Sequence, residues 1–267
     1  IYLYDNLGNS ICAYADNEIR LAGTEEDSIK FEYSTKDWTN QNVTVKASVV
    51  MEDITFQTSK DGVNWYDTDT QVFETNGTMY VRLLQEGTEI LTETADVDNI
   101  DKEIPEGTIT ANSKATKITV NVDAKDIPAN NQYGCSGIKG YYYSIDNGQT
   151  YTDITTSNTY TFSGLEEDTR YDIKVKVEDN AGNILELSTT KNTLKVILTL
   201  SSTSGTVIDG STVTATISGQ NYGTLSVSSD DVNVATASIN GNTLSITGTI
   251  TSGTKTARIT VRGSDGG

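Results

Sequence analysis

Polar and apolar side chains alternate along short stretches of this chain, most clearly at residues 171–177. Tyr171, Ile173, Val175 and Val177 share one phase there, and charged residues separate them. A strand with one face in a core and the other in water shows this period of two. The same alternation recurs in "NVTVKASVV" and in "TKITVNVDA". The pattern predicts a series of half-buried strands.

Turn-forming residues separate these stretches at short intervals. Asp61-Gly62 and Asp146-Asn147-Gly148 stand between alternating runs, where residues that tolerate positive φ form tight hairpins. Hydrophobic residues make up 35% of the 267 positions, which suits several small sandwich cores better than one large α/β core. Short connections between the patterned segments favour a semi-rigid arrangement. We therefore expect an all-β chain of tandem β-sandwiches forming an extended rod.

Charge and residue usage narrow the classes of function. The formal net charge is −18 and the isoelectric point is about 4.2, and such a surface repels nucleic acid. Histidine, the commonest general base and transition-metal ligand, does not occur. No apolar run is long enough for a signal peptide or a membrane span. Cys12 and Cys135 fall in different predicted units, so we expect no disulfide.

Residues 104–194 resemble a fibronectin type III domain. "YTFSGLEEDTRY" places Leu165 and Tyr171 on either side of an acidic turn, as in the tyrosine corner of that family. "IKGYYYSIDNGQTYTDI" supplies an internal hairpin. The early-strand Trp that is typical of the family is missing, so other residues must fill its place in the core. The resemblance implies that Leu165 and Tyr171 have structural roles.

Two further segments resemble bacterial Ig-like families. "WTNQNVTV", "SKDGVNWY", "NGTMYVRL" and "VDNIDKEIP" occur in this order within residues 30–103, as in Ig-like repeats of Gram-positive surface and secreted proteins. "SSDDVNVATASINGNTLSITG" and "ARITV", within residues 195–267, resemble an invasin/intimin-type domain. "IYLYDNLGNSICAY", within residues 1–29, has the form of a closing hairpin. We expect that segment to be the remnant of a preceding repeat in a longer chain.

The densest acidic cluster lies where the first two complete sandwiches are expected to join. It consists of Asp96, Asp98, Asp101 and Glu103. Carboxylate oxygens are the ligands that Ca²⁺ prefers, and a shared ion would stiffen the junction. A solvated acidic linker accounts for the same residues without an ion. An interdomain Ca²⁺ is therefore a hypothesis, and we expect no other cofactor.

Aromatic residues on two predicted hairpins are candidates for a ligand surface: Trp65, Tyr66, Tyr141 and Tyr143. Exposed aromatic faces can hold a sugar ring or a protein side chain. Trp65 follows a turn, which favours packing over its own sheet. Strand alternation places Tyr142 opposite its two neighbours, so the tyrosine run is divided between two faces.

Covalent crosslinks of the kind found in surface adhesins receive little support. Lys46 and Lys117 fall on the outward phase of their strands, away from the core where an isopeptide bond forms. Cys12 and Gln71 fall in different units, whereas a thioester requires near contact between its partners. We expect neither crosslink.

These features favour a non-enzymatic stalk or adhesive region of an extracellular bacterial cell-surface protein. Its partners would be flanking domains of a longer chain and a host or cell-surface glycan or protein. Two alternatives stay open: a phage virion protein that decorates a tail or capsid, and an accessory region of a secreted polysaccharide-degrading enzyme. Fold resemblance does not choose among them, because such sandwiches host many functions.

Overall fold

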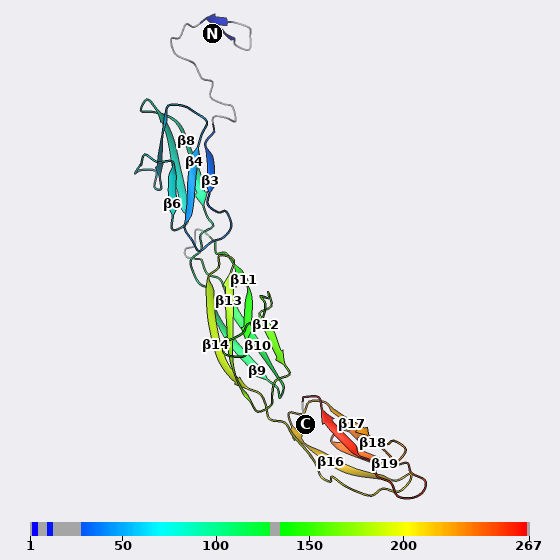
Figure 1. Cartoon of the computed structure of the whole chain (residues 1–267). Coiled ribbons are helices and arrows are strands. Elements are labelled where there is room, and N and C mark those ends of the chain that lie inside the picture. The colour runs from blue at the N-terminus through cyan, green and yellow to red at the C-terminus, as the bar shows by residue number, and fades with distance from the viewer. Residues whose placement is uncertain (1, 5–9, 13–27, 129–133, 266–267) are drawn as a thin grey trace. The chain divides into compact units, whose positions relative to one another are not determined.

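The computed structural model of the protein describes residues 2–4, 10–12, 28–128 and 134–265. Every regular element in these ranges is a strand, and the strands pair in antiparallel sheets. The chain divides into two compact units, unit 1 (residues 1–102) and unit 2 (residues 103–267). The all-β class and the tandem Ig-like sandwich architecture predicted from the sequence are confirmed (Figure 1).

Unit 1 contains a strand pair and one sandwich, which we call the first sandwich. Its strands are β1 (Tyr2–Tyr4), β2 (Ser10–Cys12), β3 (Lys30–Tyr33), β4 (Val43–Ser48), β5 (Ile54–Ser59), β6 (Thr70–Phe73), β7 (Gly77–Gln85) and β8 (Thr88–Val97). β1 pairs with β2. The sheets of the sandwich have the orders β3-β4-β6 and β5-β7-β8.

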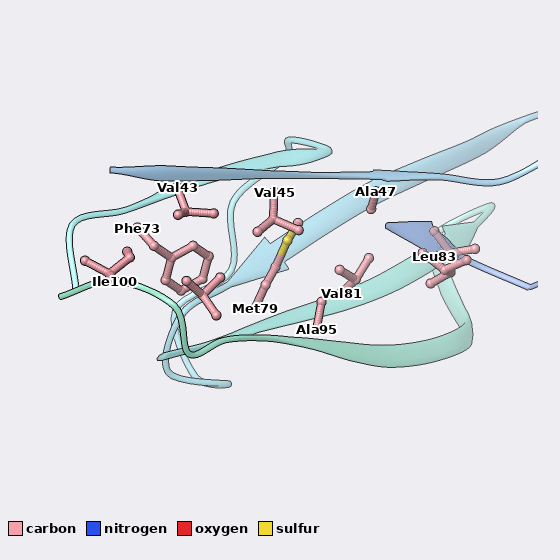
Figure 2. Packing of buried hydrophobic residues seen from close by; sticks show 11 residues of the cluster. Val43, Val45, Ala47, Phe73, Met79, Val81, Leu83, Ala95 and Ile100 are labelled. Carbon is pink, nitrogen blue, oxygen red and sulfur yellow. The ribbon is translucent and has the colours of Figure 1, made fainter. Parts of the chain in front are cut away.

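The core of the first sandwich lies between β4 on one sheet and β7 on the other. Alternate residues of each strand point inward, and they meet in a cluster that includes Val43, Val45, Ala47, Met79, Val81 and Leu83 (Figure 2). Phe73 from β6 and Ile100, beyond β8, belong to the same cluster. The apolar phase of "NVTVKASVV" is therefore the buried face of β4, as its alternation predicts.

The second sandwich occupies the first part of unit 2. Its strands are β9 (Glu106–Ser113), β10 (Lys117–Lys125), β11 (Ile138–Ser144), β12 (Thr159–Ser163), β13 (Arg170–Asp179) and β14 (Ile184–Asn192). The sheet orders are β9-β10-β12 and β11-β13-β14. This repeats the topology of the first sandwich strand for strand, so the two can be compared position by position.

The third sandwich, also in unit 2, is built differently. Its strands are β15 (Ile197–Leu200), β16 (Thr212–Gln220), β17 (Leu225–Ser229), β18 (Ala235–Asn240), β19 (Thr243–Gly248) and β20 (Ile259–Gly263). They form one sheet of order β15-β16-β19-β18 and a second sheet that contains β17 and β20. Its fully buried cluster is small, with Ala215, Ile217 and Leu244 at the centre.

The predicted boundary at residue 103 lies between β8 and β9, and Ile29, just before the predicted start of the first sandwich at residue 30, belongs to its core. The division of the chain after Lys102 lies one residue before the predicted boundary at residue 103. The predicted boundary at residue 194 lies between β14 and β15, but the second and third sandwiches stay together in one compact unit. The turn of the predicted N-terminal hairpin lies outside the described residues.

Candidate functional site

A serine and an aspartate organise the turn that follows β5 in the first sandwich. The Asp61 carboxylate accepts hydrogen bonds from the Ser59 hydroxyl (2.8 Å), the Val63 backbone N–H (2.8 Å) and both the backbone and side-chain nitrogens of Asn64 (2.8 and 2.7 Å). The Ser59 hydroxyl also accepts from the Gly62 N–H at 2.9 Å. These donors, with Asn64 the strongest, hold the pKa of Asp61 well below its ordinary value.

The second sandwich carries the same turn after β11, the strand that corresponds to β5. Asp146 accepts from the Ser144 hydroxyl (2.7 Å) and from the Thr150 hydroxyl and N–H (2.6 and 3.0 Å). The Gly148 N–H donates to Ser144 Oγ at 2.8 Å. The Thr150 hydroxyl is the main reason why the pKa of Asp146 is also lowered. The serine–aspartate turn is thus a repeated structural element, which caps backbone N–H groups that the sheet cannot pair.

An aromatic residue under a cation follows each turn. The Arg82 guanidinium lies 4.3 Å from the centre of the Trp65 ring, and the Lys176 ammonium lies 4.7 Å from the centre of the Tyr151 ring. Arg82 also donates from Nε to the Gln57 side chain at 2.8 Å. Trp65 therefore packs over its own sheet, and its ring face is covered by Arg82.

Tyr66, the next residue, is where the two hairpins differ. Its backbone pairs with Thr58 through two hydrogen bonds of 2.9 and 3.0 Å. At the matching place in the second sandwich, Thr152 donates from its N–H to the Tyr143 carbonyl oxygen at 2.9 Å. The Tyr66 side chain is 62% exposed. It lines an open groove together with Lys60, Asp61, Asn64, Thr68, Thr70 and Gln71.

Tyr141 and Tyr143 are buried, so the prediction that they form a ligand surface is wrong. Their side chains are 7% and 1% exposed and belong to the core of the second sandwich. The Tyr143 hydroxyl donates to the Ser157 carbonyl oxygen at 2.8 Å, and its ring stacks on Tyr160 at 5.1 Å. Burial raises the pKa of Tyr143 to about 12. Both rings fill volume in the core of the second sandwich.

Tyr142 lies on the outer face of β11, opposite its neighbours as the alternation predicts. Its hydroxyl donates to the Glu178 carboxylate at 2.5 Å, and Lys139 donates to the same carboxylate at 2.6 Å. Glu178 raises the pKa of both partners, and they lower the pKa of Glu178. The group is a surface ion pair on the sheet and carries no free nucleophile or base.

The four acidic residues predicted to hold Ca²⁺ have different surroundings. Asp96 lies on the exposed phase of β8 and accepts from the Thr78 hydroxyl at 2.7 Å. Asp98 and Glu103 are exposed, whereas Asp101 is buried and its N–H donates to the Thr39 carbonyl oxygen at 2.9 Å. Within the described ranges, Asp96, Asp98 and Glu103 belong to no close group of metal-ligating side chains. The interdomain ion stays a prediction.

A pair of aspartates in unit 2 was not expected from the sequence. Carboxylate oxygens of Asp126 and Asp179 lie within 4.8 Å of each other. Asp179, which is fully buried, accepts from the backbone and side-chain nitrogens of Asn183 at 2.7 and 2.8 Å. Asp126 accepts from the Gly137 N–H at 2.6 Å. Asp126 thus binds the segment just before β11, whereas Asp179, the last residue of β13, binds Asn183 within its own turn.

Of the two residues predicted to have structural roles, Leu165 lies in the turn before β13 and Tyr171 is the second residue of β13. The Tyr171 hydroxyl accepts a hydrogen bond from the Glu166 N–H at 3.0 Å, which is the return to upstream backbone that a tyrosine corner requires. Leu165 packs against the core of the second sandwich, and its N–H donates to the Thr116 carbonyl oxygen at 3.0 Å. Together they fix the start of β13 to the start of β10.

Comparisons with known proteins add the following findings. A scan of protein-family models and a search of curated proteins found no match. Among solved structures, the FN1–FN3 domains of chicken CNTN1 are 14% identical, with a TM-score of 0.30 over 61% of this chain and 66% of that one. Domains A168–A170 of titin are 13% identical, with a TM-score of 0.40 over 62% and 66%. In both cases the match spans just under two thirds of the other chain.

No helix in the described part of the chain is long and apolar enough to cross a membrane.

Proposed function

We propose that this chain is a non-catalytic spacer and presenting region of a modular extracellular protein on a bacterial cell surface. Its sandwiches would hold a binding element at a distance from the envelope. The observation that carries the proposal is the connector between the second and third sandwiches, residues 193–196, which is hydrogen-bonded on both sides. A spacer transmits position only if its connectors resist bending.

The connector is bound to the second sandwich at its first two residues. The Thr193 N–H donates to the Thr169 carbonyl oxygen at 2.9 Å, and the Thr193 side chain is buried. The Leu194 N–H donates to the Lys114 carbonyl oxygen at 3.0 Å. These bonds extend the pairing of the second sandwich past the end of β14, so the strand does not open into a loose loop.

The last two connector residues complete the junction. The Val196 N–H donates to the Glu167 carboxylate at 2.5 Å, and the Asn221 side chain donates to the Lys195 carbonyl oxygen at 2.8 Å. Glu167 comes from the turn that Tyr171 anchors, and Asn221 follows β16 of the third sandwich. An exposed ion pair between Lys195 and Asp168 adds little by itself.

The described acidic and nucleophilic groups support a non-catalytic function. Asp61 and Asp146 are committed to their turns, and Glu178 is committed to a surface ion pair. Catalysis by carboxylates needs two acids that converge on a pocket with room for substrate. The neighbouring carboxylates of Asp126 and Asp179 instead accept hydrogen bonds from the Gly137 and Asn183 backbone N–H groups.

The proposal can be tested by displaying the intact chain between a cell-wall anchor and a distal binding domain. We expect the cells to capture ligand-coated beads better than cells that carry the same domain on a Gly/Ser linker of equal length. Inserting eight Gly/Ser residues after Leu194 should reduce this advantage, whereas the same insertion after Gly253, in an exposed turn, should not. Equal capture by the native chain and the flexible linker would overturn the spacer function. Hydrolysis of a polysaccharide by the purified chain would overturn its non-catalytic character.

A further inference from the structure

The groove beside the serine–aspartate turn of the first sandwich combines one exposed aromatic ring with polar side chains. It is lined by Lys60, Asp61, Asn64, Tyr66, Thr68, Thr70 and Gln71. Tyr66 is the only aromatic side chain in this lining. The groove belongs entirely to unit 1, and it is open to solvent rather than enclosed.

Tyr66 is not required by the fold of the hairpin. The second sandwich repeats the turn, the following aromatic residue and its covering cation, but it has Thr152 where the first sandwich has Tyr66. Thr152 maintains the equivalent backbone hydrogen bond to β11. Tyr66 is 62% exposed, so burial of its ring contributes little to the stability of the sandwich. Threonine occupies the same position in the second hairpin. The Tyr66 ring is therefore available to a ligand.

The polar side chains of the groove offer mainly hydrogen-bond acceptors. The Asn64 amide nitrogen donates to Asp61 at 2.7 Å, and the Gln71 amide nitrogen donates to the Thr58 hydroxyl at 2.8 Å. Both amide oxygens are left to accept from a ligand. The Lys60 ammonium donates to a backbone carbonyl oxygen and lies 5.2 Å from the centre of the Phe73 ring. The ammonium keeps further N–H donors, and the Asp61 carboxylate in the same lining offsets its charge.

We propose that this groove binds a neutral oligosaccharide, with one pyranose ring packed on the face of Tyr66. A pyranose has an apolar C–H face that suits an aromatic ring, and its hydroxyl groups donate to acceptors such as the Asn64 and Gln71 amide oxygens. The net charge of −18 opposes anionic polysaccharides. An open groove admits residues from the middle of a glycan chain. This binding activity goes beyond the spacer function and does not depend on it.

The test is an NMR titration of the intact ¹⁵N-labelled chain with defined hexasaccharides. The neutral probes are cellohexaose, xylohexaose, mannohexaose and chitohexaose, and the anionic control is hexagalacturonate. We expect at least one neutral probe to shift the amide signals of residues 60–71 in a saturable way. Tyr66→Thr, which installs the residue of the second hairpin, should weaken this binding about tenfold, the effect of one lost stacking contact.

Two further variants separate ligand contact from folding. Tyr66→Phe keeps the ring and should bind within about twofold of the native chain, because the stacking face is unchanged. Val63→Thr alters the 77% exposed residue at the tip of the same turn, outside the groove lining, and should leave binding unchanged. The proposal is overturned if no neutral probe shifts residues 60–71, if Tyr66→Thr binds as well as the native chain, or if hexagalacturonate is preferred. A negative titration would not affect the bead-capture test of the proposed spacer function.

Discussion

Replacing Tyr171 by Phe tests whether the tyrosine corner stabilises the second sandwich. The change removes only the hydroxyl that accepts the 3.0 Å hydrogen bond from the Glu166 N–H. The ring stays, so its packing against the core of the second sandwich is preserved. We expect the free energy of unfolding to fall by about 1 kcal/mol, the net value of one such hydrogen bond. Solvent can reach the freed N–H, which keeps the loss from being larger.

The matched control is Tyr160→Phe in the same sandwich. The Tyr160 ring stacks on Tyr143 and packs edge-on against Phe162, at 5.1 and 4.9 Å between ring centres, and within the described residues its hydroxyl has no hydrogen-bond partner. Removing that hydroxyl should therefore change stability by less than about 0.5 kcal/mol. The two variants delete the same atom from the same residue type, so their difference reports the corner bond.

Calorimetry and urea unfolding of the intact chain supply the measurement. A loss of about 1 kcal/mol should lower the melting temperature of unit 2 by roughly 2–4 °C in Tyr171→Phe, with the urea slope unchanged. If Tyr171→Phe and Tyr160→Phe melt at the same temperature, the hydroxyl contributes no net stability and the reasoning fails. A larger loss with a changed urea slope would show that the whole turn, rather than one bond, had been disrupted.

Three further predictions concern acid stability, backbone packing and calcium. Folding lowers the pKa values of Asp61 and Asp146, so the stability that their carboxylates contribute is complete above the unfolded-state pKa of about 3.9 and is lost as the pH falls below it. The melting temperature of Asp146→Asn should therefore fall less steeply in acid than that of the native chain. An unchanged dependence of melting temperature on pH would contradict this. Gly219→Ala should melt earlier than Gly241→Ala, because a Cβ at Gly219 would lie 1.9 Å from the Ile197 carbonyl oxygen whereas Gly241 has open space beside it. Millimolar CaCl₂ should raise the melting temperature if carboxylates at the junction of residues 96–103 bind the ion, and a temperature equal to that in EDTA would remove the interdomain Ca²⁺.

Strand positions could be predicted from the sequence because alternation is a local property. Val43 and Val45 are buried while Lys46, on the outward phase, is exposed, as the period of two requires. The Asp61-Gly62 turn could be predicted in the same way, because its residues tolerate positive φ. Within each of these segments, neighbouring residues alone decide the pattern.

Which face of a strand is buried is not a local property where both faces carry similar residues. The run Tyr141–Tyr142–Tyr143 alternates as predicted, but the pattern does not say which phase points inward. Burial of Tyr141 and Tyr143 follows from their packing against β10 and β12. The approach of Asp126 to Asp179 likewise depends on long-range pairing and has no local signature.

Two copies of one hairpin in a single chain separate what the fold requires from what it does not. Ser59 and Asp61 recur as Ser144 and Asp146 with the same hydrogen bonds, so these residues are explained by the turn alone. Trp65, an obvious candidate for ligand binding, corresponds to Tyr151, and a cation covers the ring in both hairpins. Packing within the sandwich therefore accounts for Trp65. Tyr66 has no such counterpart, and its exposure is the difference that structure leaves unexplained. The second hairpin forms with Thr152 at this position, so the fold of the first hairpin does not require the Tyr66 ring.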